Sequence, residues 1–325
     1  MTRHILTGLA LTALACHAAP DPVEDFRSGV PREETVTVDG PARPGQGQAL
    51  SQDVEVQSRA LRGLLSESAV LTAGVTALIN GGALFVGALV KTVVLAVPPT
   101  SLKDDTAVWG PFSGGLDPVT WKVTVTRVAD HQFQWRFQGR PRRQPSGAFV
   151  TVLSGTHTAA ADANGDQIGG FGDGSFTIDL DARATLPLPS PRQVGSASYS
   201  YSRQPGATTT VSAQFRQVLD DHDRRVDIDY AYTRKAGQGG SVDFVDSAAA
   251  QMGMPAGRWS FRTRWMAGGS GRTDARVAAP DALTASQCWN AALLSTFLVH
   301  SWEPSAGYGT EGTDCSFPTA DFSSL

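Results

Sequence analysis

Apolar and polar residues alternate with a period of two from Trp121 onward. Phe133, Trp135 and Phe137, for example, are separated by Gln134 and Arg136. Runs of this kind recur between residues 119 and 279, and turn residues such as Gln-Pro-Gly or Asn-Gly bound each of them. This pattern predicts an antiparallel sheet of about eight to ten strands, with one face turned to a core and the other to water.

Residues 50–97 carry a different, helical spacing. The first part is amphipathic, whereas the 23 residues between Glu67 and Lys91 contain no charge. A run of that length can cross a bilayer, or it can form helix that is buried on every side by protein. We favour the buried helix because Asn80, Gly81 and Gly82 are expected to break or kink a continuous helix there.

These two patterns together predict the fold class. A large one-sided sheet cannot leave an aromatic face in water, and the apolar helical segment is the obvious cover. We therefore expect a mainly β (α+β) protein, in which a curved antiparallel sheet packs over an apolar helical segment. Helical spacing resumes at Cys288, Leu293 and Phe297. It predicts a C-terminal helix and loop over residues 282–325.

The amino terminus is typical of an export signal. Arg3 precedes the uncharged run from Ile5 to Ala15, which is too short to span a bilayer comfortably. This run and the following Cys16 resemble the bacterial lipobox, although Ala13 stands where that motif prefers Leu, Val or Ile. The resemblance implies that Cys16 is acylated and anchors the protein to a membrane. The alternative is an ordinary signal peptide cleaved near residues 18–19.

The predicted organisation has three parts. Residues 1–15 form a signal peptide, residues 16–48 a lipidated cysteine and a flexible tether rich in Pro and Gly, and residues 49–325 a single globular domain. By resemblance to the sorting rule of enteric bacteria, His17 after the cysteine implies the outer membrane. We therefore expect a cell-envelope lipoprotein that faces the periplasm or the surface.

Composition narrows the function classes. Acidic residues outnumber basic ones by 31 to 27, which argues against a general nucleic-acid binder. With Cys16 lipidated, two of the three cysteines remain, and an exported protein lies in an oxidising compartment. Cys288 and Cys315 are therefore expected to form a disulfide that pins the C-terminal tail. The alternative is two unrelated cysteines.

Few residues point to catalysis or metal binding. The densest ionisable cluster, Asp221, His222 and Asp223, is a weak candidate for a divalent metal, and a polar hairpin turn is the favoured interpretation. Asp162 to Asp166 starts like a calcium loop, but Gln167 stands at the position of the loop glycine. We expect no cofactor and no enzymatic activity.

Family resemblance adds little about activity. Arginine greatly outnumbers lysine, and the segment Ser-Gln-Cys-Trp at 286–289 accompanies the paired cysteines. With the lipobox, these features resemble the uncharacterised predicted lipoproteins of myxobacteria. The expected outline also resembles the lipoprotein-localisation carriers of the outer membrane, by architecture alone. The first hypothesis is a non-catalytic envelope lipoprotein that interacts with other envelope proteins. The second is a carrier of an apolar or lipid ligand, and the third is a metal-dependent hydrolase.

Overall fold

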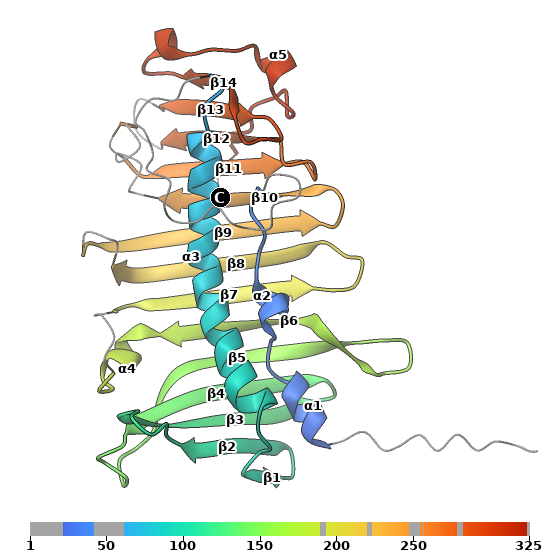
Figure 1. Cartoon of the computed structure of the whole chain (residues 1–325), viewed down its shortest axis with the longest axis vertical. Helices are drawn as coiled ribbons and strands as arrows, with labels where there is room; N and C mark the ends of the chain where they lie inside the picture. Colours follow the sequence, from blue (N-terminus) through green and yellow to red (C-terminus); the bar gives the residue numbers. More distant parts are fainter. Residues whose placement is uncertain are drawn as a thin grey trace, which may run out of the picture.

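The alternating segments form one open antiparallel sheet in the computed structural model (Figure 1), which describes residues 22–41, 62–188, 193–219, 223–246, 254–255, 257–277 and 282–323. Within those residues the sheet has 14 strands, and each strand pairs with its neighbours in the sequence. The strands are β1 (Ser101–Lys103), β2 (Thr106–Phe112), β3 (Val119–Ala129), β4 (Gln132–Pro141), β5 (Val150–Ala161), β6 (Gln167–Asp179), β7 (Ser196–Arg203), β8 (Thr209–Leu219), β9 (Arg225–Lys235), β10 (Gly239–Asp246), β11 (Trp259–Trp265), β12 (Gly271–Val277), β13 (Thr284–Trp289) and β14 (Ser295–His300).

The helices are few. They are α1 (Pro22–Ser28), α2 (Glu33–Val36), α3 (Glu67–Leu89), a π-helical continuation η1 (Val90–Leu95), α4 (Leu180–Ala184), a 3-10 turn η3 (Pro304–Ala306) and α5 (Glu311–Asp314). The predicted class, a mainly β protein with an antiparallel sheet packed over an apolar helix, is confirmed.

The two faces of the sheet follow from the alternation. On β4, Phe133, Trp135 and Phe137 are buried on the inner face, the face that α3 covers, whereas Gln134 and Arg136 are exposed on the outer face. Gly155 of β5 lies directly opposite Trp135, and a Cβ at that glycine would come within 2.8 Å of the indole ring. The glycine therefore provides the space that the large ring needs.

Helix α3 lies across the strands and contacts many of them (Figure 1). Near its start, the Ser68 backbone N–H donates to Gln287 Oε1 of β13 at 2.9 Å. Further along, the hydroxyls of Thr72 and Thr263 of β11 are 3.0 Å apart, and the Tyr199 hydroxyl of β7 donates to the Ile79 carbonyl at 3.3 Å. A single helix thus joins strands that do not pair with one another.

The predicted helix break at residues 80–82 is wrong, because α3 runs through it without interruption. The side chain of Asn80 accepts from the Val38 N–H and donates to the Val38 carbonyl, both at 2.9 Å. Gly82 lies against the Tyr199 hydroxyl, which occupies the space that a Cβ would need. Tertiary contacts therefore use both residues and offset their low helix propensity.

Among the described residues, α3 is covered by the sheet and along one flank by residues 22–41, so the expected burial on every side is also wrong. Ala69, Thr72, Ile79 and Ala83 face the sheet, while the opposite stripe leaves Leu78 49% exposed. None of the helices in the described part of the chain combines the length and apolar character needed to span a membrane. The predicted helical residues 50–61 lie outside the described residues.

The flexible tether predicted for residues 16–48 is wrong for residues 22–41, which are folded onto the inner face. Phe26 of α1 packs edge-on against Phe133 with ring centroids 6.2 Å apart, and Arg203 of β7 donates to the Thr37 carbonyl at 2.8 Å. A few buried anchors such as Val36 hold a segment whose Pro and Gly content is otherwise typical of a linker. The predicted domain boundary at residue 49 therefore cuts through one packed unit.

The predicted C-terminal helix is also wrong, because residues 284–300 form β13 and β14. Leu293 between them adopts a left-handed turn conformation with φ 61°. β13 is covered on both faces, so its apolar residues do not alternate and their spacing imitates that of a helix. The sheet consequently extends from residue 101 to residue 300, beyond the predicted 119–279.

Alanine substitutions at two adjacent glycines of α3 should have opposite effects on stability. Gly81→Ala places a Cβ in open space and should raise the melting temperature, because alanine gains about 1 kcal/mol of helix propensity. Gly82→Ala forces the Cβ against the buried Tyr199 ring and should lower the melting temperature. Thermal unfolding followed by circular dichroism measures both, and equal shifts of the same sign would contradict this packing.

Candidate functional site

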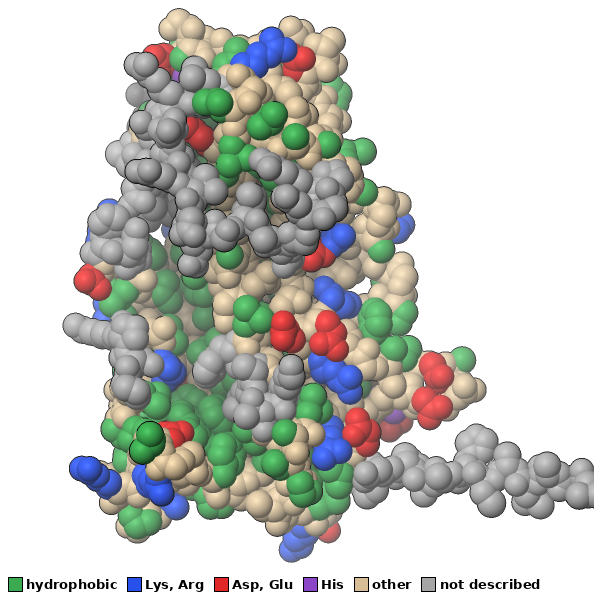
Figure 2. Space-filling model, viewed as in Figure 1, with side chains coloured by type: hydrophobic (Ala, Val, Ile, Leu, Met, Phe, Trp, Pro, Cys, Tyr) green, Lys and Arg blue, Asp and Glu red, His purple; other side chains and the backbone are tan. Residues whose placement is uncertain are grey.

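The two flanks of α3 have different surroundings. One flank packs against residues 22–41, where Asn80 bonds to Val38 and a Cβ at Gly87 would come within 2.8 Å of the Glu33 side chain. Leu71, Val75 and Leu78 are spaced by four and three residues, so they form a stripe on the opposite flank. Figure 2 shows an apolar hollow beside this flank, between the helix and the sheet.

The inner face of the sheet forms the floor of the hollow. Ile178 of β6, Ala197 of β7 and Phe215 of β8 lie opposite one another in register. The Phe215 ring also contacts Tyr199 edge-on at 5.9 Å, and Tyr199 in turn contacts α3. Leu180 and Leu188, which follow β6, are partly buried against the same core.

The hollow is defined here by Leu78 of α3 with Ile178, Ala197 and Phe215 of the sheet, and the last three are themselves buried. None of these four side chains has a polar or titratable atom. A surface of this kind can remove an apolar group from water at about 25 cal/mol per Å² of buried area. It offers binding, and its lining offers no acid, base or nucleophile.

A polar pair lies buried elsewhere on the inner face. Nδ1 of His157 on β5 is 2.9 Å from the Tyr201 hydroxyl of β7, and glycines at 172 and 174 of β6 leave room for the two rings. Burial lowers the pKa of His157 to about 4 from 6.5, against the opposing charge of Asp173. The imidazole is therefore neutral near pH 7, and its hydrogen bond is structural.

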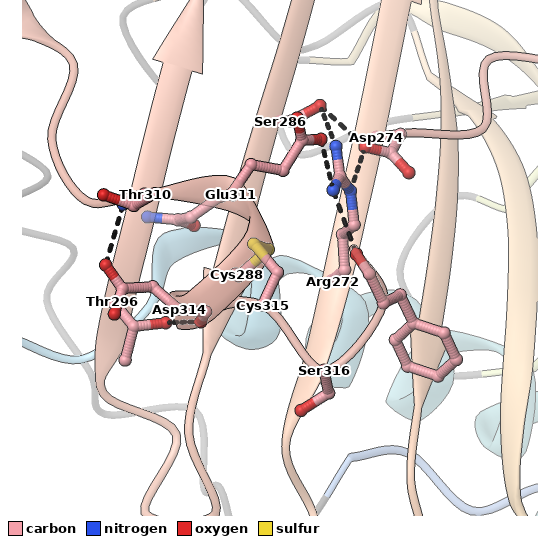
Figure 3. The surroundings of a disulfide bond; sticks show 12 residues. Arg272, Asp274, Ser286, Cys288, Thr296, Thr310, Glu311, Asp314, Cys315 and Ser316 are labelled. Atoms are coloured by element: carbon pink, nitrogen blue, oxygen red, sulfur yellow. Dashed lines mark hydrogen bonds and ion pairs between the residues drawn. A yellow bond between two sulfur atoms is a disulfide. The ribbon is translucent and has the colours of Figure 1, made fainter. Parts of the chain in front are cut away.

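A second polar cluster holds the C-terminal tail on the outer face of the sheet (Figure 3). Arg272 and Asp274 of β12 are fully buried, with Nε and Oδ1 2.6 Å apart. Arg272 Nη1 reaches Glu311 Oε1 of the tail at 2.6 Å and donates to the Phe317 carbonyl at 3.0 Å. Removing one partner would leave a buried charge uncompensated, which explains why the tail and the sheet form one unit.

The predicted disulfide is present beside this cluster. Cys288 of β13 lies opposite Arg272 in register and is bonded to Cys315, with Sγ atoms 2.05 Å and Cα atoms 5.3 Å apart. The bond joins the outer face of the sheet to the tail, where the sequence predicted that it would join a helix to a loop. Cys16, the predicted lipidation site, lies outside the described residues.

The weak metal candidates are only partly placed. Asp223 adopts φ 58° just before β9, which fits the turn interpretation, whereas Asp221 and His222 lie outside the described residues. Asp162 Oδ1 accepts from the backbone N–H groups of Asn164 and Asp166 at 2.8 and 3.0 Å, so it closes a turn. Across the described ranges, no group of three or more His, Cys, Asp or Glu residues is placed to hold a metal ion.

The carrier hypothesis placed an apolar ligand between the sheet and its helix, but the sequence named none of the residues of the hollow. It missed the His157 pair and the Arg272 cluster. The alternation along β5 places His157 on the inner face with Leu153 and Gly155, so the period of two could have indicated its burial. The side of α3 on which the hollow lies depends on which flank another segment covers, and no local pattern indicates that. Comparison with known proteins finds no matching family model, no matching curated protein and no matching solved structure.

The buried histidine predicts that stability falls with acid. The unfolded chain binds a proton near pH 6.5, but folded His157 binds one only near pH 4. The unfolded state holds more protons between these values, so the free energy of unfolding should fall by on the order of 3 kcal/mol from pH 6.5 to 4.

Urea unfolding at several pH values measures this slope in the parent protein, in His157→Gln and in His131→Gln. The slope should flatten in His157→Gln, where the buried imidazole is gone. It should persist in the control His131→Gln, because that histidine is only partly buried. An unchanged slope in His157→Gln would contradict the assignment.

Proposed function

We propose that this protein is a lipid-anchored, non-catalytic protein of the bacterial cell envelope, where it has an interaction role. The observation that carries the proposal is the Cys288–Cys315 disulfide, which joins the C-terminal tail to the sheet. Disulfides of this structural kind persist in oxidising compartments such as the periplasm and are rare in the cytosol. The export signal and Cys16 then account for how the chain arrives there and how it is held.

The folded N-terminal segment determines how close to the membrane such an anchor would hold the domain. Cys16 lies six positions before Pro22, where α1 begins. Six residues span at most about 20 Å, so an acyl group on Cys16 would hold α1 close to the membrane surface. Since α1 contacts β2 and β3, the membrane would lie near that end of the sheet. Stable anchoring would need more than one acyl chain, because a single chain binds only marginally.

Substituting the proposed lipidation site should release the protein from the membrane. We expect Cys16→Ser, produced with its own signal in a bacterium, to move from the membrane fraction to the soluble fraction. Intact mass spectrometry should find acyl groups on the parent chain only. The Cys288–Cys315 bond should be retained in both chains, as alkylation of free thiols would show. A parent chain that is soluble and carries no acyl mass would overturn the lipoprotein assignment.

A second candidate function is binding of an apolar ligand such as an acyl chain, and the hollow beside α3 favours it. Leu78 and the three sheet residues that define it have hydrocarbon side chains. Leu78 is 49% exposed at the edge, so burying it under a ligand would be favourable. An acyl chain matches this lining because it needs no polar partner.

A charge placed in the hollow should abolish this binding. Titration with N-phenyl-1-naphthylamine, an uncharged fluorescent probe, measures the affinity. We expect Leu78→Glu to weaken it at least about tenfold, since a carboxylate would have to be desolvated beside the probe. Leu102→Glu is the matched control, because Leu102 is 40% exposed on β1, away from the hollow. Equal affinities in the two variants would remove the hollow as the binding site.

A further inference from the structure

The outer face of the sheet carries a groove of about 720 Å³ across β8 to β12. One row of directly opposed residues crosses it from strand to strand, namely Gln214, Asp229, Val245, Ser260 and Arg276. The volume falls within the range of small-molecule sites. β9 and β11 lie two strand spacings apart, about 10 Å. Val245 between them is only 8% exposed, and the Arg258 side chain reaches across β10 to Asp229 of β9.

The groove is lined by cations from both of its sides. Arg216 of β8 pairs with Asp229 of β9, and Arg258, which directly precedes β11, reaches the same carboxylate at 3.4 Å. Arg276 of β12 lines the side beyond β11. Three arginines and one aspartate give the lining a formal charge of +2. The nearby carboxylate of Asp227 also interacts electrostatically with Arg216 and Arg258.

Arg276 differs from the three arginines nearest to it on β11 and β12. Arg262 is paired with Asp243 and Asp321, Arg264 with Asp274, and Arg272 with Asp274 and Glu311. Among the described residues, Arg276 has neither a hydrogen-bond nor an ion-pair partner, and it is only partly buried. A guanidinium that borders a groove and whose N–H groups make no hydrogen bond can bind a ligand there.

We propose that this groove binds a phosphoryl group, carried by a small soluble phosphomonoester or by a lipid headgroup. A phosphomonoester carries about −1.5 to −2 charges near pH 7, which matches the +2 of the lining. The guanidinium fork donates two parallel hydrogen bonds to a phosphoryl group. Asp229 holds Arg216 and Arg258 in place, and the hydroxyl of Ser260 is a further donor on the lining.

Calorimetric titration of the full chain, in an uncharged detergent at low ionic strength, tests this site with glycerol 3-phosphate as the probe. We expect saturable one-to-one binding that weakens at least about tenfold in Arg276→Gln, and similarly in Arg258→Gln. Arg136→Gln is the matched control, because Arg136 is an exposed arginine on the same face of β4, outside the groove. Its affinity should equal that of the parent. Glycerol, which has no phosphoryl group, should not bind.

A second arm separates the two sources of the phosphoryl group. Flotation of the Cys16→Ser chain, which has no acyl anchor, compares vesicles of phosphatidylcholine alone with vesicles that also contain phosphatidic acid, a monoester headgroup. Glycerol 3-phosphate binding supports a soluble ligand. Extra binding to the vesicles that contain phosphatidic acid, without binding of glycerol 3-phosphate, supports a headgroup. This extra binding should be lost in Arg276→Gln and kept in Arg136→Gln.

Absence of both responses overturns the proposal, as does a response that Arg276→Gln and Arg258→Gln leave unchanged. Because Arg276 has no partner among the described residues, its variant should keep the parent circular dichroism spectrum and melting temperature. Loss of ligand binding in that variant therefore reports on the groove. The outcome is independent of the lipid anchor and of the apolar hollow.

Discussion

A single helix is too narrow to cover the inner face of this sheet, and the rest of the structure follows from that mismatch. The strand β6 has 13 residues and is about 43 Å long, whereas a helix with its side chains is about 10 Å across. Helix α3 therefore buries only a stripe along the middle of the face. The aromatic side chains to either side of that stripe need other cover, or they remain available to something outside the domain.

The two sides of α3 meet this constraint in different ways. On one side, residues 22–41 supply the missing cover, with Phe26 against Phe133 and Val36 in the core. On the other side, the helix flank and the ends of β6 to β8 border an apolar hollow. Residues 22–41 have the composition of a linker, yet they stabilise the fold. A few apolar anchors suffice because the sheet already offers an apolar surface to them.

The sequence predicted the features that depend on periodicity and missed those that depend on a second layer. The alternation along β4 and the presence of an apolar helix after Glu67 follow from local spacing, so both could be predicted from the chain. β13 was mistaken for helix because the C-terminal tail buries its outer face as well, which removes the polar half of the alternation. Arg272 and Asp274 are two residues apart on one strand, so a shared face was predictable. Their burial depends on Glu311 and Phe317, which come from the tail.

The proposed apolar and phosphoryl sites lie on opposite faces of the sheet and meet at strand β8. Phe215 of β8 is buried on the inner face, while the next residue, Arg216, borders the groove on the outer face. The paired backbone of the sheet separates them, and β8 is hydrogen-bonded on both sides, to β7 and to β9. One amphiphile could not place its acyl chain in the hollow and its phosphate in the groove without breaking that pairing. Two ligands, or a ligand and a membrane, would be needed to occupy both, and each would bind without requiring the other.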